Sequence, residues 1–91
     1  DAERDSLLNA YPNPASESLA VAFYSGKAQT LTLSLNKISG KLVQEQMIKV
    51  LPYHTNTLQV EFTRRVSSGT YILAIKNESG ELFTRRIVIR N

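Results

Sequence analysis

The sequence lacks cysteine and tryptophan, has a single histidine, and contains no long apolar run. Without cysteine, neither disulfide bonds nor thiolate metal sites can hold the chain together. A membrane-spanning helix needs about 18–20 consecutive apolar residues, and no stretch of the sequence approaches that length. A chain of 91 residues is therefore expected to form one small domain stabilised by packing alone. Such a domain buries roughly 60–65% of the surface that its unfolded chain exposes.

The sequence offers little for catalysis or for metal binding. Asp1 and Asp5 are its only aspartates, and both lie in the polar N-terminal stretch. His54 has no carboxylate near it in sequence, whereas a Ser-His-Asp triad needs a buried carboxylate to orient its imidazole. There is no Gly-x-Ser-x-Gly turn to present a nucleophile, and one histidine without cysteine does not make a zinc site. We therefore predict that the chain is not an enzyme and binds no cofactor or metal ion.

Positive charge is concentrated in the last third of the chain. From Arg64 onward there are six basic and two acidic residues, a local charge of +4, whereas residues 1–63 have five basic and six acidic residues, a local charge of −1. A basic surface suits phosphate, an acidic glycan or an acidic receptor. It also keeps an edge strand soluble, which is the simpler interpretation. Nucleic acid is not predicted as a partner, because no basic helix or basic stripe with interleaved aromatics is present.

Alternating apolar and polar side chains predict strands along most of the chain. Residues 18–24, 29–36 and 57–63 each place three apolar side chains on one face. Residues 41–50 are less regular, and a bulge is expected there because either register is possible. Six to seven short strands spaced about 8–14 residues apart, with no amphipathic helix, predict an all-β, immunoglobulin-like antiparallel sandwich. The core-facing side chains expected in the three regular segments are Leu19, Val21, Phe23, Leu31, Leu33, Leu35, Leu58, Val60 and Phe62.

The last third of the sequence predicts one long antiparallel hairpin. Residues 70–76 form its first strand, residues 77–80 its turn, and residues 81–91 its second strand. Asn77-Glu78-Ser79 also fits the N-glycosylation pattern, but the same residues are ordinary turn formers, and we interpret them as the turn. Chain ends fray unless they are tied down. A hydrophobic strand that runs this close to the end is therefore expected to be held by other parts of the molecule.

Two short motifs flank the predicted strands. In Tyr11-Pro12-Asn13-Pro14, each proline removes a backbone donor and keeps the preceding residue extended. We expect a stiff entry to the domain, with the Tyr11 side chain packed against the core. Gly69 precedes a strand, and Tyr71 is placed to bury its ring and to return its hydroxyl to a nearby backbone group, as in a tyrosine corner.

The N-terminal stretch predicts a connection to something upstream. It opens with Asp1-Ala2-Glu3-Arg4-Asp5, with no initiator methionine and no signal peptide. We expect the chain to be part of a longer protein, with residues 1–10 as a linker and residues 11–91 as the domain.

Four motifs in this order resemble the type A C-terminal sorting domain of the type IX secretion system. The resemblance extends over about residues 9–91, and each motif alone is weak. Together, at this spacing and ending near the C-terminus, they are specific. The motifs are Tyr11-Pro12-Asn13-Pro14, Ser39-Gly40-Lys41-Leu42-Val43, Ser68-Gly69-Thr70-Tyr71-Ile72-Leu73 and Arg85-Arg86-Ile87-Val88-Ile89.

The resemblance implies a role that composition does not show. Domains of this family are immunoglobulin-like sandwiches at the C-terminus of secreted cargo proteins. After the cargo crosses the inner membrane into the periplasm, the outer-membrane translocon recognises the domain. A surface sortase then removes many of these domains and joins the cargo to anionic lipopolysaccharide, so the cargo ends at the cell surface or is secreted. By the same resemblance, cleavage is expected in or before residues 1–10.

The family motifs assign candidate residues by position in this chain. Where the family often has lysine, this chain has Arg85-Arg86, which serves if the receptor recognises charge alone. The resemblance implies a structural role for Tyr11, Pro12, Asn13, Pro14 and Gly40. It implies recognition by the translocon or sortase for Gly69, Tyr71, Arg85, Arg86, Ile87, Val88, Ile89, Arg90 and Asn91.

Alternation along the last strand suggests how the signal is recognised. Ile87 and Ile89 are expected to close the core, while Arg85, Arg86 and Arg90 form a basic outer face that a receptor meets by strand addition. Two other functions remain open. An adhesive or carbohydrate-binding module would need an exposed aromatic platform, for which Tyr24 and Tyr53 are the candidates. A structural spacer or a weak homodimer would need no partner in the secretion machinery.

Overall fold

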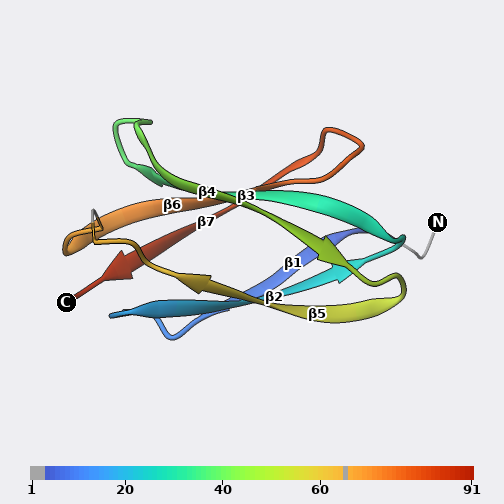
Figure 1. Ribbon diagram of the computed structural model, residues 1–91, viewed down its shortest axis with the longest axis horizontal. Helices are drawn as coiled ribbons and strands as arrows, with labels where there is room; N and C mark the ends of the chain where they lie inside the picture. The colour runs from blue at the N-terminus through green and yellow to red at the C-terminus, as the bar shows by residue number, and fades with distance from the viewer. Residues whose placement is uncertain (1–3, 65) are drawn as a thin grey trace.

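The computed structural model describes residues 4–64 and 66–91, which form two packed antiparallel sheets (Figure 1). One sheet has the strand order β1-β2-β5 and the other has the order β4-β3-β6-β7. The predicted all-β sandwich of six to seven strands is confirmed. The strands are β1 (Ser6–Tyr11), β2 (Ser18–Ser25), β3 (Gln29–Lys37), β4 (Leu42–Val50), β5 (His54–Glu61), β6 (Gly69–Lys76) and β7 (Leu82–Ile89).

The core lies between the sheets and is built by strict alternation. The inward side chains of β2 and β3 match the prediction, since Leu19, Val21, Phe23, Leu31, Leu33 and Leu35 are all 0–1% exposed. In the β6–β7 hairpin, four side chains are fully buried, those of Leu73, Ile75, Ile87 and Ile89. Phe62 departs from the prediction, because β5 ends at Glu61 and leaves Phe62 only partly buried.

Residues 6–10 are part of strand β1, so their interpretation as part of a linker is wrong. Leu7 pairs with Phe23 and Ala10 with Val21, so both face the core, three positions apart, because a bulge falls between Leu7 and Asn9. The bulge removes the period of two that would have indicated a strand. It also puts Tyr11 on the outer face, where the side chain is 45% exposed instead of packed against the core. Residues 1–3 of the predicted linker lie outside the described residues.

The middle of the chain contains the bulge that the sequence predicted. Leu35 pairs with Gln44 and Asn36 with Leu42, so Val43 is an extra residue in β4. β5 begins at His54, three residues before the alternating pattern that starts at residue 57. His54 remains exposed, and its Nδ1 lies 3.1 Å from the carbonyl oxygen of Pro52. The described part of the chain has no helix long and apolar enough to cross a membrane.

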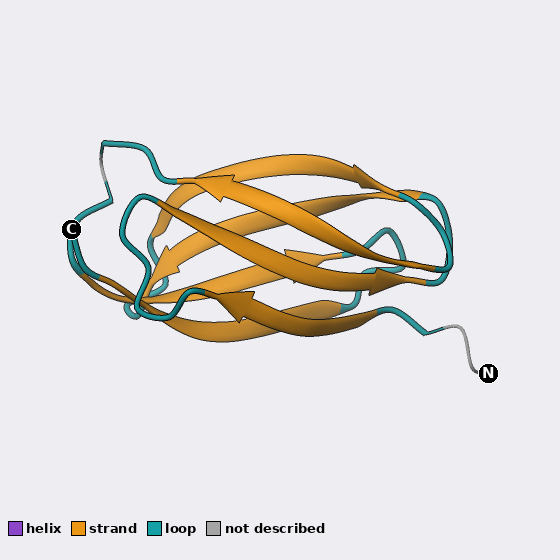
Figure 2. Ribbon diagram, turned by 90° about the horizontal axis from the view of Figure 1, so that it is seen from below, coloured by secondary structure: helices purple, strands orange, loops and turns teal. Residues whose placement is uncertain are grey.

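The start of β1 and the C-terminus lie at opposite ends of the sandwich (Figures 1 and 2). At the β1 end, the Asp5 carboxylate joins three segments. Its Oδ1 accepts the Gly26 N–H at 2.8 Å, and its Oδ2 accepts the side-chain amides of Gln29 and Asn77 at 2.8 and 2.7 Å. Asp5 therefore fixes the beginning of the domain to the β2–β3 loop and to the β6–β7 turn.

Residues 77–80 form the predicted turn between β6 and β7. Asn77 is 4% exposed, and its Nδ2 also donates to the Glu81 carboxylate at 2.9 Å. The Asn77 carbonyl oxygen accepts the Gly80 N–H at 3.1 Å. The side-chain amide of Asn77 is thus used inside the fold, in agreement with the turn interpretation.

The environment of Asp5 lowers the pKa of its carboxyl group below the ordinary value of 3.8. Partial burial by itself raises the pKa. The hydrogen bonds from Gly26, Asn77 and Gln29, together with the positive charge of Lys27, outweigh that effect. Because the folded-state pKa is lowered, the charged carboxylate stabilises the fold above the pKa of the unfolded chain. This contribution is lost as the pH falls through the folded-state pKa.

We expect Asp5→Asn to lower the free energy of unfolding by about 1.5–3 kcal/mol near neutral pH, since hydrogen bonds to a charged group are lost. The difference between wild type and variant should shrink in urea titrations below pH 3.8. Glu45→Gln, which removes an exposed carboxylate of β4, is the control and should change stability by less than about 0.5 kcal/mol. If Asp5→Asn lowered the free energy of unfolding as much in acid as at neutral pH, the charge of the Asp5 carboxylate would not be what stabilises the fold.

Candidate recognition site at the C-terminal strand

The side chains of β7 divide between two faces. Ile87 and Ile89 are fully buried, and Arg85 lies on the same inward side of the strand because it is two residues from Ile87. Its guanidinium Nη2 donates to the carbonyl oxygen of Leu7 at 3.4 Å. The expectation that Arg85 shares the outer face with the other arginines is therefore wrong. The alternation that buries the isoleucines also turns Arg85 inward.

The opposite side of the strand carries the two remaining basic residues. The side chains of Arg86 and Arg90 are exposed, and Val88 between them is half-buried. Among the described residues, none forms an ion pair with Arg86. The exposed basic surface at this strand therefore consists of two arginines rather than three.

The segment after β1 holds the last residues of β7, and we call Asn13 and Ala15 the entry clamp. The Val88 N–H donates to Asn13 Oδ1 at 2.9 Å, and the Val88 carbonyl accepts the Ala15 N–H at 2.8 Å. The Arg90 N–H donates to the Ala15 carbonyl at 2.7 Å. Ala15 is 1% exposed and makes a parallel bridge with Ile89. The Tyr11–Pro14 motif, which contains two cis X-Pro bonds, thus leads directly into contacts with the C-terminal strand.

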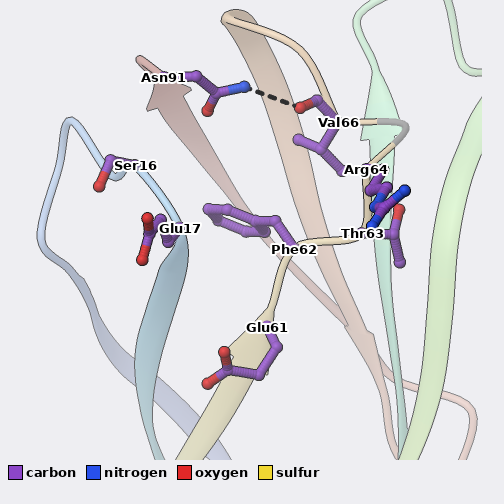
Figure 3. A pocket seen from close by; sticks show the side chains of 8 residues that line it. All are labelled: Ser16, Glu17, Glu61, Phe62, Thr63, Arg64, Val66 and Asn91. Atoms are coloured by element: carbon purple, nitrogen blue, oxygen red, sulfur yellow. Dashed lines mark hydrogen bonds between the residues drawn. The ribbon is translucent and has the colours of Figure 1, made fainter.

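The final residue is held from the other side. The Asn91 N–H donates to Ser68 Oγ at 2.9 Å, and its side-chain Nδ2 donates to the Val66 carbonyl at 3.0 Å, the bond drawn in Figure 3. The predicted tethering of the chain end is confirmed.

The predicted backbone contact of the Tyr71 hydroxyl is also confirmed. The Tyr71 side chain is 3% exposed, and its hydroxyl donates to the Ser67 carbonyl at 2.7 Å. Gly69, at the start of the same strand, has a backbone φ of 157°, which residues with a side chain rarely adopt. A Cβ at this position would lie 3.7 Å from the Tyr71 ring. Gly40 has φ 96° in the β3–β4 turn. Gly69 and Tyr71 therefore shape the segment against which Asn91 rests.

An open groove of about 660 Å³ adjoins the terminus (Figure 3). The Phe62 side chain points into it, and its charges are mixed, with Glu17, Glu61 and Arg64 at its rim. No histidine or cysteine lines it, and the described residues contain no group of three or more metal-ligating side chains. The lining residues of the groove are Ser16, Glu17, Glu61, Phe62, Thr63, Arg64, Val66 and Asn91.

Sequence reasoning missed the partners that fix the terminal strand. Asn13 lay within a recognised motif, but its bond to Val88 spans 75 positions. Ala15, Ser68 and Val66 contribute mainly through backbone atoms or a common hydroxyl, which leave no pattern in a single sequence.

Comparisons with known proteins identify a family and support the fold. The model of a family described as "Secretion system C-terminal sorting domain" matches residues 9–90, which confirms the resemblance seen in the motifs. No curated protein matches the chain in sequence.

Among solved structures, the chain is similar to CopC from Methylosinus trichosporium OB3b, with a TM-score of 0.62 at 15% identity over 96% of this chain and 94% of that one. It is also similar to a part of a β-glucosidase from Listeria innocua, with a TM-score of 0.50 at 13% identity over 97% of this chain but 16% of that one. Identities this low show the fold alone.

The entry clamp generates a prediction about stability. Asn13→Ala removes the acceptor for the Val88 N–H, and we expect the free energy of unfolding in urea to fall by about 1 kcal/mol. Asn13→Asp keeps an oxygen at the same position and should stay near the wild-type value. Equal losses in the two variants would show that the acceptor oxygen does not stabilise the strand.

Proposed function

Since the chain belongs to the family of secretion system C-terminal sorting domains, we propose that it is a non-enzymatic signal domain of a type IX secretion system. It directs a covalently linked N-terminal cargo protein through the outer-membrane translocon. Family membership supports a C-terminal sorting signal and export of the cargo to the cell surface or beyond it. Passage through the periplasm precedes the translocon step.

The observation that carries this proposal is the placement of the two chain ends. The strand that the family motifs mark as the signal is fixed by the entry clamp and by Ser68 and Val66. It ends at the pole of the sandwich opposite to the start of β1, to which the cargo would be joined (Figure 2). A receptor can therefore approach the signal while the cargo is still attached.

We further propose that a surface sortase cleaves the chain before β1 and attaches the cargo to anionic lipopolysaccharide. From Ser6 onward the backbone is paired with β2, and Asp5 is bound by three donors. A protease cleft takes an extended and unpaired segment, so the bond that is cut lies on the N-terminal side of Asp5. This position is narrower than the one expected from the sequence, which was in or before residues 1–10.

The alternative functions have less support. A glycan-binding module would gather aromatic side chains into one platform. Of the two candidates, Tyr53 is 64% exposed in the β4–β5 turn, whereas Tyr24 is half-buried in β2. Tyr11 is 45% exposed but lies at the far end of β1, so it cannot join Tyr53 in one platform. A spacer or weak homodimer predicts that the domain can be deleted without loss of export.

The proposed function is tested with a reporter protein fused to residues 1–91 in a bacterium that has a type IX secretion system. We expect surface or extracellular reporter with the domain and none without it. A short tag after Asn91 should abolish export, because the added residues would displace Asn91 from Ser68 and Val66 and loosen the end of β7. The same tag between the reporter and Asp1 is the control and should leave export intact. Export of the reporter without the domain would contradict the proposal.

A further inference from the structure

One row of backbone groups on β7 faces away from the sheet. β7 is an outer strand that pairs only with β6 within its sheet. Val88 belongs to the outward row, because its N–H and carbonyl both bond to the entry clamp. In an antiparallel ladder the direction alternates with every residue, and the β6–β7 register has no bulge. The N–H and carbonyl groups of Thr84 and Arg86 therefore also face outward.

The outward row is covered at one end and open at the other. The clamp covers Val88 and Arg90. Among the described residues, none forms a hydrogen bond with the outward backbone groups of Thr84 or Arg86. We call the stretch Leu82–Arg86 the open edge of β7.

Side chains cover backbone groups on two of the other edge strands. On β5, the Glu61 and Gln59 carbonyls accept the side-chain amides of Gln44 and Gln46 at 3.0 and 3.4 Å, both from the opposite sheet. On β1, the Ala10 N–H donates to Asn9 Oδ1 at 2.9 Å, and a bulge interrupts the strand. Natural sheets block edges in these ways because an uncovered edge pairs with other strands. The open edge of β7 has no such cover among the described residues.

Charge selects the kind of strand that fits this edge. Arg86 is exposed beside the open backbone groups, and Arg85 lies on the other side of the same strand. Pairing with a second copy would bring four arginine side chains onto two adjacent strands, and like charges across a pair are destabilising. An incoming strand with aspartate or glutamate beside Arg86 gains an opposite-charge pair instead. The edge therefore disfavours self-pairing and favours an acidic partner.

We propose that the open edge, and not the last residues of the chain, is the surface that the secretion machinery binds. An extended acidic segment of the receptor adds to the four-stranded sheet as a fifth strand and hydrogen bonds with Thr84 and Arg86. The residues after Arg86 then act by holding β7 in place. This inference rests on the proposed function and specifies the chemistry of the partner.

Proline at position 84 tests strand addition directly. The Thr84 N–H faces outward, so Thr84→Pro removes no bond to β6, and proline is tolerated in edge strands at such positions. Thr57→Pro is the matched control. The Gln59 and Glu61 carbonyls of β5 face away from β2, and Thr57 faces the same way because it lies two residues before Gln59 on the same strand. We expect Thr84→Pro to lower reporter export by at least about tenfold while its circular dichroism stays that of wild type. Thr57→Pro should be exported normally.

Arg86→Glu tests whether the partner strand carries an acidic residue beside Arg86. It changes only a side chain and leaves every backbone N–H in place. Lys49→Glu makes the same change in net charge on β4, the strand at the other edge of this sheet, and is its control. We expect export to fall by at least about tenfold for Arg86→Glu alone, with both variants folded.

The outcomes separate this inference from the proposed function. If the wild-type fusion is not exported, the proposed function fails. If wild type and folded Thr84→Pro are exported equally, strand addition at this edge is refuted while the proposed function stands. Normal export of Arg86→Glu refutes the acidic partner. A wild-type dimer in sedimentation that Thr84→Pro converts to monomer would show that a second copy occupies the edge, which also refutes the proposal.

Discussion

The structure depends on the hydrogen bonds that join the segment after β1 to the end of β7. Ile87 and Ile89 are fully buried, yet they belong to the last strand of the chain and to the outer position in its sheet. Without a partner on its free side, such a strand would fray and expose both side chains. The Asn13 carboxamide and the Ala15 backbone supply that partner. The motif at the entry of the domain and the motif at its end are therefore two parts of one contact.

This contact also divides the terminal strand into parts with different roles. Its last residues are occupied by the clamp, by Ser68 and by Val66, so they are used for stability. Its first residues have outward backbone groups that form no hydrogen bond with any described residue, and these groups lie beside the exposed Arg86. At the other pole, Asp5 fixes the β6–β7 turn from which β7 starts. Both ends of β7 are thus positioned by residues from the beginning of the chain, which couples the position of β7 to the folding of the whole domain.

Much of the fold could be predicted because it depends on alternation, which is a local property. Strands β2 and β3 and the final hairpin followed their patterns closely, and the hydroxyl contact of Tyr71 followed from its place at the start of a strand. β1 was missed because its bulge breaks the alternation. Asp5 was assigned to a linker because its partners lie 21, 24 and 72 positions away. The face of Arg85 was within reach of the sequence, since burying Ile87 and Ile89 already places it inward.

The account is tested most directly by amide hydrogen exchange of the isolated domain, followed residue by residue by nuclear magnetic resonance. Because the clamp covers one part of the outward row and leaves the other open, the amides of Val88 and Arg90 should be protected. Those of Thr84 and Arg86 should exchange at rates close to those of exposed, unbonded amides. Strong protection of Thr84 and Arg86, or rapid exchange of Val88 and Arg90, would contradict the division of β7 into a clamped end and an open edge.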